Sequence, residues 1–152
     1  MGNQTQNQYL YPVAMSDKVR MAYNESPAHV GKLKYAVDFI VAEGTPVKAA
    51  AAGVVVDLKA DSDLGGEERK AEGLGNYIEI KHENEEYSEY EHLKLGGALV
   101  KVGDRVAAGQ VIGYSGATGW LAQLGPHLHF MVGKYGATVE DYETLEIVWN
   151  YK

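Results

Sequence analysis

Eighteen glycines divide this 152-residue sequence into short segments that are rich in Val, Ile, Tyr and Ala. They make up about 12% of the residues, against a usual ~7%. Long stretches with the 3.6-residue periodicity of an amphipathic helix are missing, so short strands joined by turns are predicted. The expected strands cover residues 19–23, 35–41, 47–60, 76–81, 87–93, 111–114, 128–132 and 145–149. The chain is therefore predicted to be mainly β with little helix, a single antiparallel β-sheet or sandwich domain.

Polar segments between these strands predict turns and loops. Residues 82–86, of sequence HENEE, lie between two alternating runs and predict a hairpin turn, whereas residues 61–75 predict a surface loop that could wall a groove. Residues 1–8 are rich in Asn and Gln and predict a disordered tail, which leaves residues 9–152 as one domain. A domain of this size can complete its core alone, which favours a monomer but leaves the oligomeric state open.

Composition excludes several classes of function. The chain has no cysteine, so disulfides and thiolate metal sites are ruled out. Its formal net charge of -7 and its scattered Lys and Arg residues argue against nucleic acid and favour cationic or neutral peptides as partners. No apolar run approaches the ~20 residues needed to span a bilayer. The first eight residues show neither the basic nor the apolar segment of an export signal, so none is expected in this chain.

The strongest local motif is GPHLHF at residues 125–130. Alternate residues of a strand project to the same face, so the imidazoles of His127 and His129 are expected side by side, with Leu128 and Phe130 facing the core. The alternative from this motif alone is a pair of surface histidines on an edge strand.

Asp38 is the second candidate, because it lies inside the predicted strand over residues 35–41. Val37, Phe39 and Val41 form one apolar face of that strand, and Asp38 lies on the other. An ionised carboxylate in such a strand is costly unless it is paired, hydrogen-bonded or bound to a metal. A structural salt bridge or a turn hydrogen bond is the alternative explanation.

The three remaining histidines are ambiguous when each is taken alone. His29 precedes the strand of Asp38 in a loop that can fold back toward it, but its simplest interpretation is an exposed loop residue. By the two-residue alternation of strands, His92 is expected on the same strand face as Tyr90. His82 is expected at the hairpin tip as a solvated turn histidine, outside any site.

Four separated segments, spanning about residues 27–132, together resemble the lysostaphin and LytM family of zinc metallopeptidases in family order. They are His29 with YAVDF of residues 35–39, EGTPV of 43–47 and AGV of 52–54; GNYIEIKH of 75–82 with YEHL of 90–93; VGDRVAAGQVIG of 102–113; and TG of 118–119 with GPHLHF of 125–130. The resemblance implies the lysostaphin-like fold, a duplicated hybrid or barrel-sandwich β domain.

The resemblance also implies a site. His29, Asp38 and His129 are expected to bind one zinc ion per chain, and His92 and His127 to stay off the metal and act on the substrate. Two histidines and one carboxylate leave a fourth tetrahedral position open, as a catalytic zinc requires. The implied function is hydrolysis of peptide bonds in peptidoglycan stem peptides or cross-bridges, in an extracytoplasmic setting.

Three features differ from the usual family pattern. Nine positions separate His29 from Asp38 where the shortest family pattern has four, Met131 stands where an acidic residue is common, and residues 120–124 lengthen the last loop. The second change removes a contact that could tune metal affinity. The third places Trp120 near the expected groove, where it could alter substrate preference.

Two other functions are compatible with parts of the sequence. The family includes degenerate members that regulate other wall hydrolases, so a catalytically inactive binding module is one alternative, although such members usually lack ligands that are present here. Residues 44–53 and 102–113 also resemble the glycine-rich turns of biotinyl and lipoyl carrier domains. The hairpin at residues 82–86 offers no attachment lysine of the expected kind, which argues against a carrier.

Overall fold

The structure is a computed structural model, and it describes residues 4–16, 19–23, 34–60, 65–66, 76–94, 96–116, 119–120, 126–138 and 141–150. Its largest element is an eight-stranded sheet in which neighbouring strands are antiparallel. In spatial order the strands are β2 (Arg20–Tyr23), β3 (Val37–Ile40), β12 (Leu128–Lys134), β8 (Tyr87–Leu93), β7 (Asn76–Lys81), β5 (Gly53–Lys59) and β9 (Arg105–Val106), with β13 (Glu143–Thr144) paired to β12. The predicted mainly β architecture is confirmed.

Three two-stranded sheets complete the described structure. They are the antiparallel pair β4 (Pro46–Lys48) and β10 (Val111–Tyr114), the parallel pair β1 (Gln4–Tyr9) and β14 (Glu146–Trp149), and the parallel pair β6 (Gly65–Gly66) and β11 (Gly119–Trp120). A short 3-10 turn, η3 (Glu83–Glu85), closes the predicted hairpin between β7 and β8. Within the described ranges, no helix is long and apolar enough to cross a membrane.

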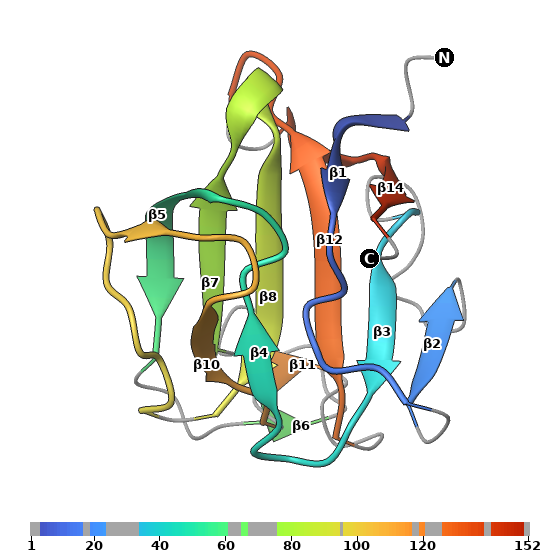
Figure 1. Ribbon diagram of the computed structural model, residues 1–152, viewed down its shortest axis with the longest axis vertical. Helices are drawn as coiled ribbons and strands as arrows, with labels where there is room; N and C mark the ends of the chain where they lie inside the picture. The colour runs from blue at the N-terminus through green and yellow to red at the C-terminus, as the bar shows by residue number, and fades with distance from the viewer. Residues whose placement is uncertain are drawn as a thin grey trace.

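The core lies between the large sheet and a layer that contains β1, β4 and β10 (Figure 1). Alternate residues of the sheet strands face this layer, because successive side chains of a strand point to opposite faces. Large side chains of the core that are fully buried include Tyr9, Val47, Phe39, Ile78, Ile80, Tyr90, Ile112, Leu128 and Phe130. The remaining side chains of these strands lie on the opposite face of the large sheet.

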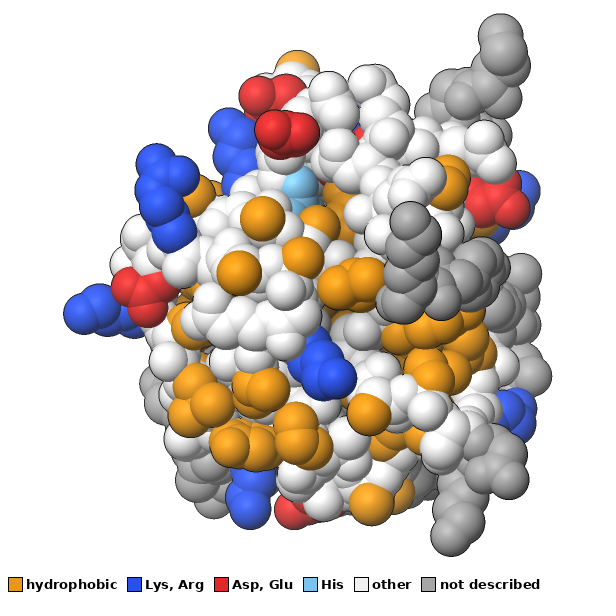
Figure 2. Space-filling view, in the orientation of Figure 1, with side chains coloured by type: hydrophobic (Ala, Val, Ile, Leu, Met, Phe, Trp, Pro, Cys, Tyr) orange, Lys and Arg blue, Asp and Glu red, His pale blue; other side chains and the backbone are white. Residues whose placement is uncertain are grey.

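The outer surface of the covering layer faces the viewer in Figures 1 and 2. In Figure 2 this face shows small groups of hydrophobic side chains among polar ones, with charged side chains mostly near its edge and very little histidine. Leu99 and Val102 are the most exposed large hydrophobic residues among those described. The candidate site lies on the other side of the large sheet.

The N-terminal segment is ordered by hydrogen bonds to the hairpin between β7 and β8. The Glu86 carboxylate is fully buried, and it accepts hydrogen bonds from the backbone N–H of Gln6 (2.6 Å) and Asn7 (3.3 Å) and from the Tyr9 hydroxyl (2.9 Å). The Asn7 amide donates to the Glu83 carbonyl (2.7 Å). The expectation of a disordered tail over residues 1–8 is therefore wrong for residues 4–8, because their polar groups have partners 76–80 positions away.

His82 is a buried structural residue, not a solvated turn histidine. Its side chain is only 6% exposed, Nδ1 lies 2.7 Å from the Ala52 carbonyl, and Nε2 lies 2.7 Å from Ser88 Oγ. Since a carbonyl only accepts, Nδ1 carries the proton and donates to Ala52. The expectation failed because the ring contacts Ala52, directly before β5, and Ser88 on β8, which both lie outside the turn itself.

This burial makes stability depend on pH. Burial lowers the pKa of His82, although the Ala52 carbonyl and the Glu86 charge favour the protonated ring. The unfolded chain therefore takes up a proton at a higher pH than the folded chain, and the stability present above about pH 6.5 is lost as the pH falls below it.

We expect the difference in free energy of unfolding between the wild type and a His82→Gln variant to shrink as the pH falls from 7.5 to 5. The loss approaches about 1.4 kcal/mol per pH unit between the two pKa values. Denaturant unfolding with a chelator present measures this difference without a contribution from bound metal. A difference that stays constant over this range would contradict the assignment of His82 as a buried neutral group.

Candidate metal and catalytic site

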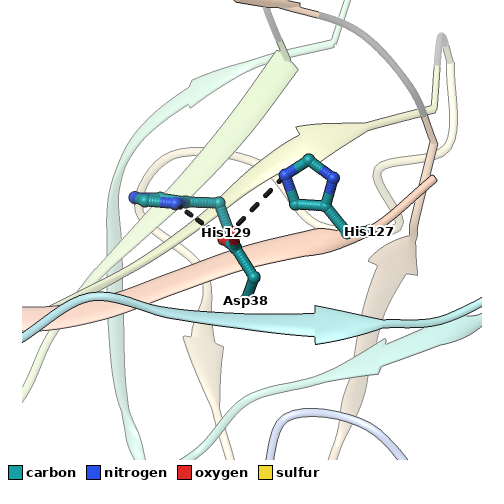
Figure 3. Close-up of polar contacts among 3 residues, drawn as sticks. All are labelled: Asp38, His127 and His129. Atoms are coloured by element: carbon teal, nitrogen blue, oxygen red, sulfur yellow. Dashed lines mark hydrogen bonds and ion pairs between the residues drawn. The ribbon is translucent and has the colours of Figure 1, made fainter. Parts of the chain in front are cut away.

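Asp38 and His129 face each other across the neighbouring strands β3 and β12. The register of the two strands pairs Asp38 with His129, between the pairs Phe39 with Leu128 and Val37 with Phe130. His129 Nδ1 donates a hydrogen bond to Asp38 Oδ1 at 3.0 Å (Figure 3). The alternation predicted for both strands is confirmed, because Phe39, Leu128 and Phe130 are in the core while Asp38 and His129 meet on the other face.

His127, the residue directly before β12, approaches the same carboxylate. Its Nε2 lies 3.9 Å from Asp38 Oδ1, and Figure 3 shows both imidazoles directed toward Asp38. Asp38 is 7% exposed, His127 8% and His129 3%. The predicted pairing of the two imidazoles on one strand face is therefore confirmed, and the surface-histidine alternative is wrong.

His92 joins this cluster through a β-bulge. On β7 the neighbours Asn76 and Tyr77 pair with Leu93 and Glu91 on β8, so that His92 is an extra residue with a φ of 65°. Its ring centroid lies 4.7 Å from that of His127 and 5.9 Å from that of His129.

The predicted sharing of a strand face by His92 and Tyr90 is wrong. Tyr90 is fully buried in the core, with its ring centroid 5.1 Å from that of Phe130. The extra residue of the bulge interrupts the two-residue alternation, so His92 turns to the face of Glu91 and His129. The bulge thereby brings a fourth polar side chain to Asp38, His127 and His129.

The third expected metal ligand, His29, lies outside the described residues. Within the described ranges, no group of three or more His, Asp or Glu side chains is arranged to hold a metal ion. What the structure brings together is one carboxylate and one imidazole in direct contact, with two further imidazoles beside them.

Carboxylates of β8 extend this face of the sheet. Glu91 pairs with His129 and Glu89 with Met131 in the strand register. Burial and the neighbouring carboxylates raise the pKa of Glu89 to about 9, so this side chain keeps its proton at neutral pH. Sequence reasoning did not identify these residues as neighbours of the site, although the alternation of YSEYE at residues 87–91 places them on one face.

Met131 packs in a second, small hydrophobic cluster on this face, with Ala36 and Tyr142. Tyr87 and Tyr135 border it, and the Tyr135 hydroxyl donates a hydrogen bond to Glu79. Met131 therefore packs against aromatic residues at the position where the family pattern has an acid, and Glu89 supplies a carboxyl group opposite it on β8.

The two loops expected to border the groove are mostly outside the described residues. Gly65 and Gly66 pair in parallel with Gly119 and Trp120. Parts of the expected loops over residues 61–75 and 120–124 therefore lie side by side, as β6 and β11 do in Figure 1.

Comparison with known families identifies the class of protein to which this fold and this site belong. Residues 32–141 match peptidase family M23, and the chain belongs to this family. The matched range includes residues 44–53 and 102–113, so family membership accounts for the glycine-rich turns that also resemble carrier domains.

Particular relatives have similar sequences and structures. The chain is 40% identical to lysostaphin of Staphylococcus simulans over 114 residues, which are 73% of this chain and 21% of lysostaphin. It is 36% identical to the peptidoglycan DD-endopeptidase ShyA of Vibrio cholerae over 126 residues, which are 79% of this chain and 26% of ShyA. The chain thus spans about a fifth to a quarter of the length of these curated relatives.

Two solved structures support the same assignment. The catalytic domain of lysostaphin from Staphylococcus simulans superposes with a TM-score of 0.60 and 32% identity, covering 84% of this chain and 90% of that domain. A zinc-containing peptidase from Vibrio cholerae superposes with a TM-score of 0.60 and 29% identity, covering 83% of this chain and 36% of that chain.

The contact between Asp38 and His129 predicts a measurable change in the pKa of His129. Burial alone lowers that pKa, but the Asp38 hydrogen bond and the negative charges of Glu91 and Asp38 outweigh it and raise the pKa above its usual value. We expect Asp38→Asn to lower the pKa of His129 in the metal-free protein, and Glu91→Gln to lower it less, because it removes a charge but no hydrogen bond. NMR titration of the His129 ring measures both pKa shifts. Asp57→Asn, at an exposed aspartate, is the matched control. Equal pKa values of His129 in the wild type and all three variants would contradict the contact between Asp38 and His129.

Proposed function

We propose that the chain is a zinc-dependent endopeptidase that hydrolyses peptide bonds in the stem peptides or cross-bridges of peptidoglycan. The observation that supports it is the direct contact of Asp38 with His129, in a buried cluster that also holds His92 and His127. Membership of peptidase family M23 and the similarity to peptidoglycan endopeptidases point to the same chemistry.

The donor atoms fit a zinc ion. Carboxylate oxygen and imidazole nitrogen are both zinc ligands, and two ligands about 2.0–2.1 Å from a tetrahedral ion lie about 3.3 Å apart. Asp38 Oδ1 and His129 Nδ1 are 3.0 Å apart, close to that separation. Asp38 and His129 would thus hold one zinc per chain, with His29 as the third ligand. The similarity to a zinc-containing peptidase supports this choice of metal.

Zinc bound there would supply the Lewis acidity that polarises a scissile carbonyl and lowers the pKa of an attacking water. His92 and His127 would hydrogen-bond the substrate oxygen as negative charge develops and carry a proton to the leaving amine. Their edge-to-face contact, at 4.7 Å between ring centroids, brings both imidazoles to one side of the His129 ligand.

The charge on the face of the large sheet that carries Asp38 and His129 is consistent with cationic or neutral peptides as substrates. Glu91 and Glu79 lie on the strands next to the cluster, and the chain as a whole carries a formal charge of -7. Peptidoglycan lies outside the cytoplasmic membrane, so an extracytoplasmic location follows from this substrate. A catalytically inactive envelope module is the alternative, and failure of the purified chain to bind zinc would favour it.

Metal content and activity should separate the ligands from the other histidines. We expect His29→Ala, Asp38→Ala and His129→Ala to lose zinc and hydrolysis together. His92→Ala and His127→Ala should keep zinc but react roughly 10²- to 10⁴-fold more slowly, because proton transfer is lost. Elemental analysis and hydrolysis rates on purified peptidoglycan measure the two properties.

The matched control for the carboxylate is Asp141→Asn, which changes an exposed aspartate whose described contacts are confined to its own loop. It should retain both zinc and rate. A His127→Ala chain with bound zinc and the wild-type rate would contradict the proposed division of roles.

The bond that is cleaved can be identified by digesting two wall preparations, one cross-linked through glycine bridges and the other directly between D-alanine and a diamino acid. We expect soluble cross-link fragments from at least one preparation, and mass spectrometry of the products locates the broken bond. The chain contains His92 and His127, the two residues proposed to act on the substrate. If the zinc-loaded protein releases fragments from neither wall, peptidoglycan is not its substrate.

A further inference from the structure

The backbone of His92 is in a conformation that its own sequence does not favour. Its φ of 65° is in the left-handed region, which is sterically unfavourable for a residue with a side chain. In a regular strand the side chain of His92 would point into the core beside Tyr90, away from His127. Contacts with neighbouring segments must therefore hold the bulge in place.

Residues 114–116 supply such contacts along one side of the bulge. The Gly116 N–H donates to the His92 carbonyl (2.8 Å), the Lys94 N–H donates to the Tyr114 carbonyl (3.0 Å), and Leu93 forms an antiparallel bridge with Ser115. These contacts bind His92 and the two residues that follow it.

Gly116 approaches the bulge too closely to carry a side chain. A Cβ atom at this position would lie 2.7 Å from both N and Cα of Lys94 and 2.9 Å from the carbonyl carbon of Leu93. These are backbone atoms, so no side-chain rotation can make room. Only a movement of residues 93–94, next to His92, or of Gly116 itself would relieve the overlap.

Ser115 connects the same segment to the strand of Asp38. It is fully buried, and its Oγ donates to the Ala42 carbonyl (2.9 Å) and accepts from the Thr45 N–H (3.1 Å). Its backbone also exchanges hydrogen bonds with Gly44 and Thr45. Residues 42–45 follow the end of β3 after one intervening position. Ser115 and Gly116 therefore link the turn after the Asp38 strand to the bulge that carries His92.

We infer that Gly116 is a positioning residue for His92: its close backbone contact, possible only without a side chain, keeps the His92 imidazole against His127. Asn76 supports the bulge from the other side, because its side chain donates to the Leu93 carbonyl (3.2 Å). The inference rests on the proposed function, in which His92 acts on the substrate. Neither Gly116 nor Asn76 contacts substrate in this scheme, and both act through His92.

A double-mutant cycle tests this inference, because residues that act through one another are not additive. Gly116→Ala should lower kcat about 10²-fold, the loss expected for a displaced catalytic group, with KM within about threefold and zinc content unchanged. In a His92→Ala background the same substitution should lower kcat less than about threefold. The probe is a soluble muropeptide dimer that carries the cross-link cleaved by the wild type.

Gly53→Ala is the matched control for general damage to folding. A Cβ at Gly53 would lie 2.3 Å from the Lys81 carbonyl oxygen, so this glycine is as crowded as Gly116, but it contacts the hairpin next to His82. We expect it to lower the unfolding temperature while the folded protein keeps its kcat. If Gly116→Ala does not fold, Asn76→Ala replaces it, with an expected tenfold loss that is absent in the His92→Ala background.

The outcomes separate the two levels of the proposal. A His92→Ala chain with the wild-type kcat would contradict the role of His92 in the proposed function. A slow His92→Ala chain in which Gly116→Ala costs the same further factor as in the wild type would overturn only the positioning inference.

Discussion

The contact between Asp38 and His129 depends on the register of β3 and β12, and the same register packs the core. One face of this strand pair buries Phe39 and Phe130, and the other brings a carboxylate against an imidazole. A slip by one residue would exchange the two faces, which would expose the aromatic side chains and bury the charged group among them. Selection for a packed core therefore also fixes the geometry of the polar pair.

This coupling also explains why a buried charge is tolerated in the middle of a sheet. Asp38 is only 7% exposed, and an unpaired carboxylate there would be strongly unfavourable. Its partner lies on the adjacent strand, where backbone hydrogen bonds already hold the two Cα atoms close together. Little additional conformational entropy is lost in forming the pair, so the site is preorganised by the ladder of the sheet.

The sequence predicted the strands with strong alternation, and it missed features that depend on distant partners. Residues 76–81, 87–93 and 111–114 form strands with the expected bounds, and alternation placed Asp38 and His129 on the polar faces of their strands. The face of His92 could not be predicted, because it is set by a bulge that a segment more than twenty positions away holds in place. The polar N-terminal segment was not predicted as a strand either, because the Glu86 carboxylate that accepts its hydrogen bonds lies far away in the sequence.

The buried carboxylate of Glu86 has a consequence for where this folding unit ends. Residues 32–141 match peptidase family M23, whereas β1 and β14 lie outside this range and pair with each other. A fragment cut to residues 32–141 would remove Tyr9 from the interior and deprive the Glu86 carboxylate of the three hydrogen-bond donors that compensate for its burial. Shuffling of this module between proteins would thus have to carry both flanking strands.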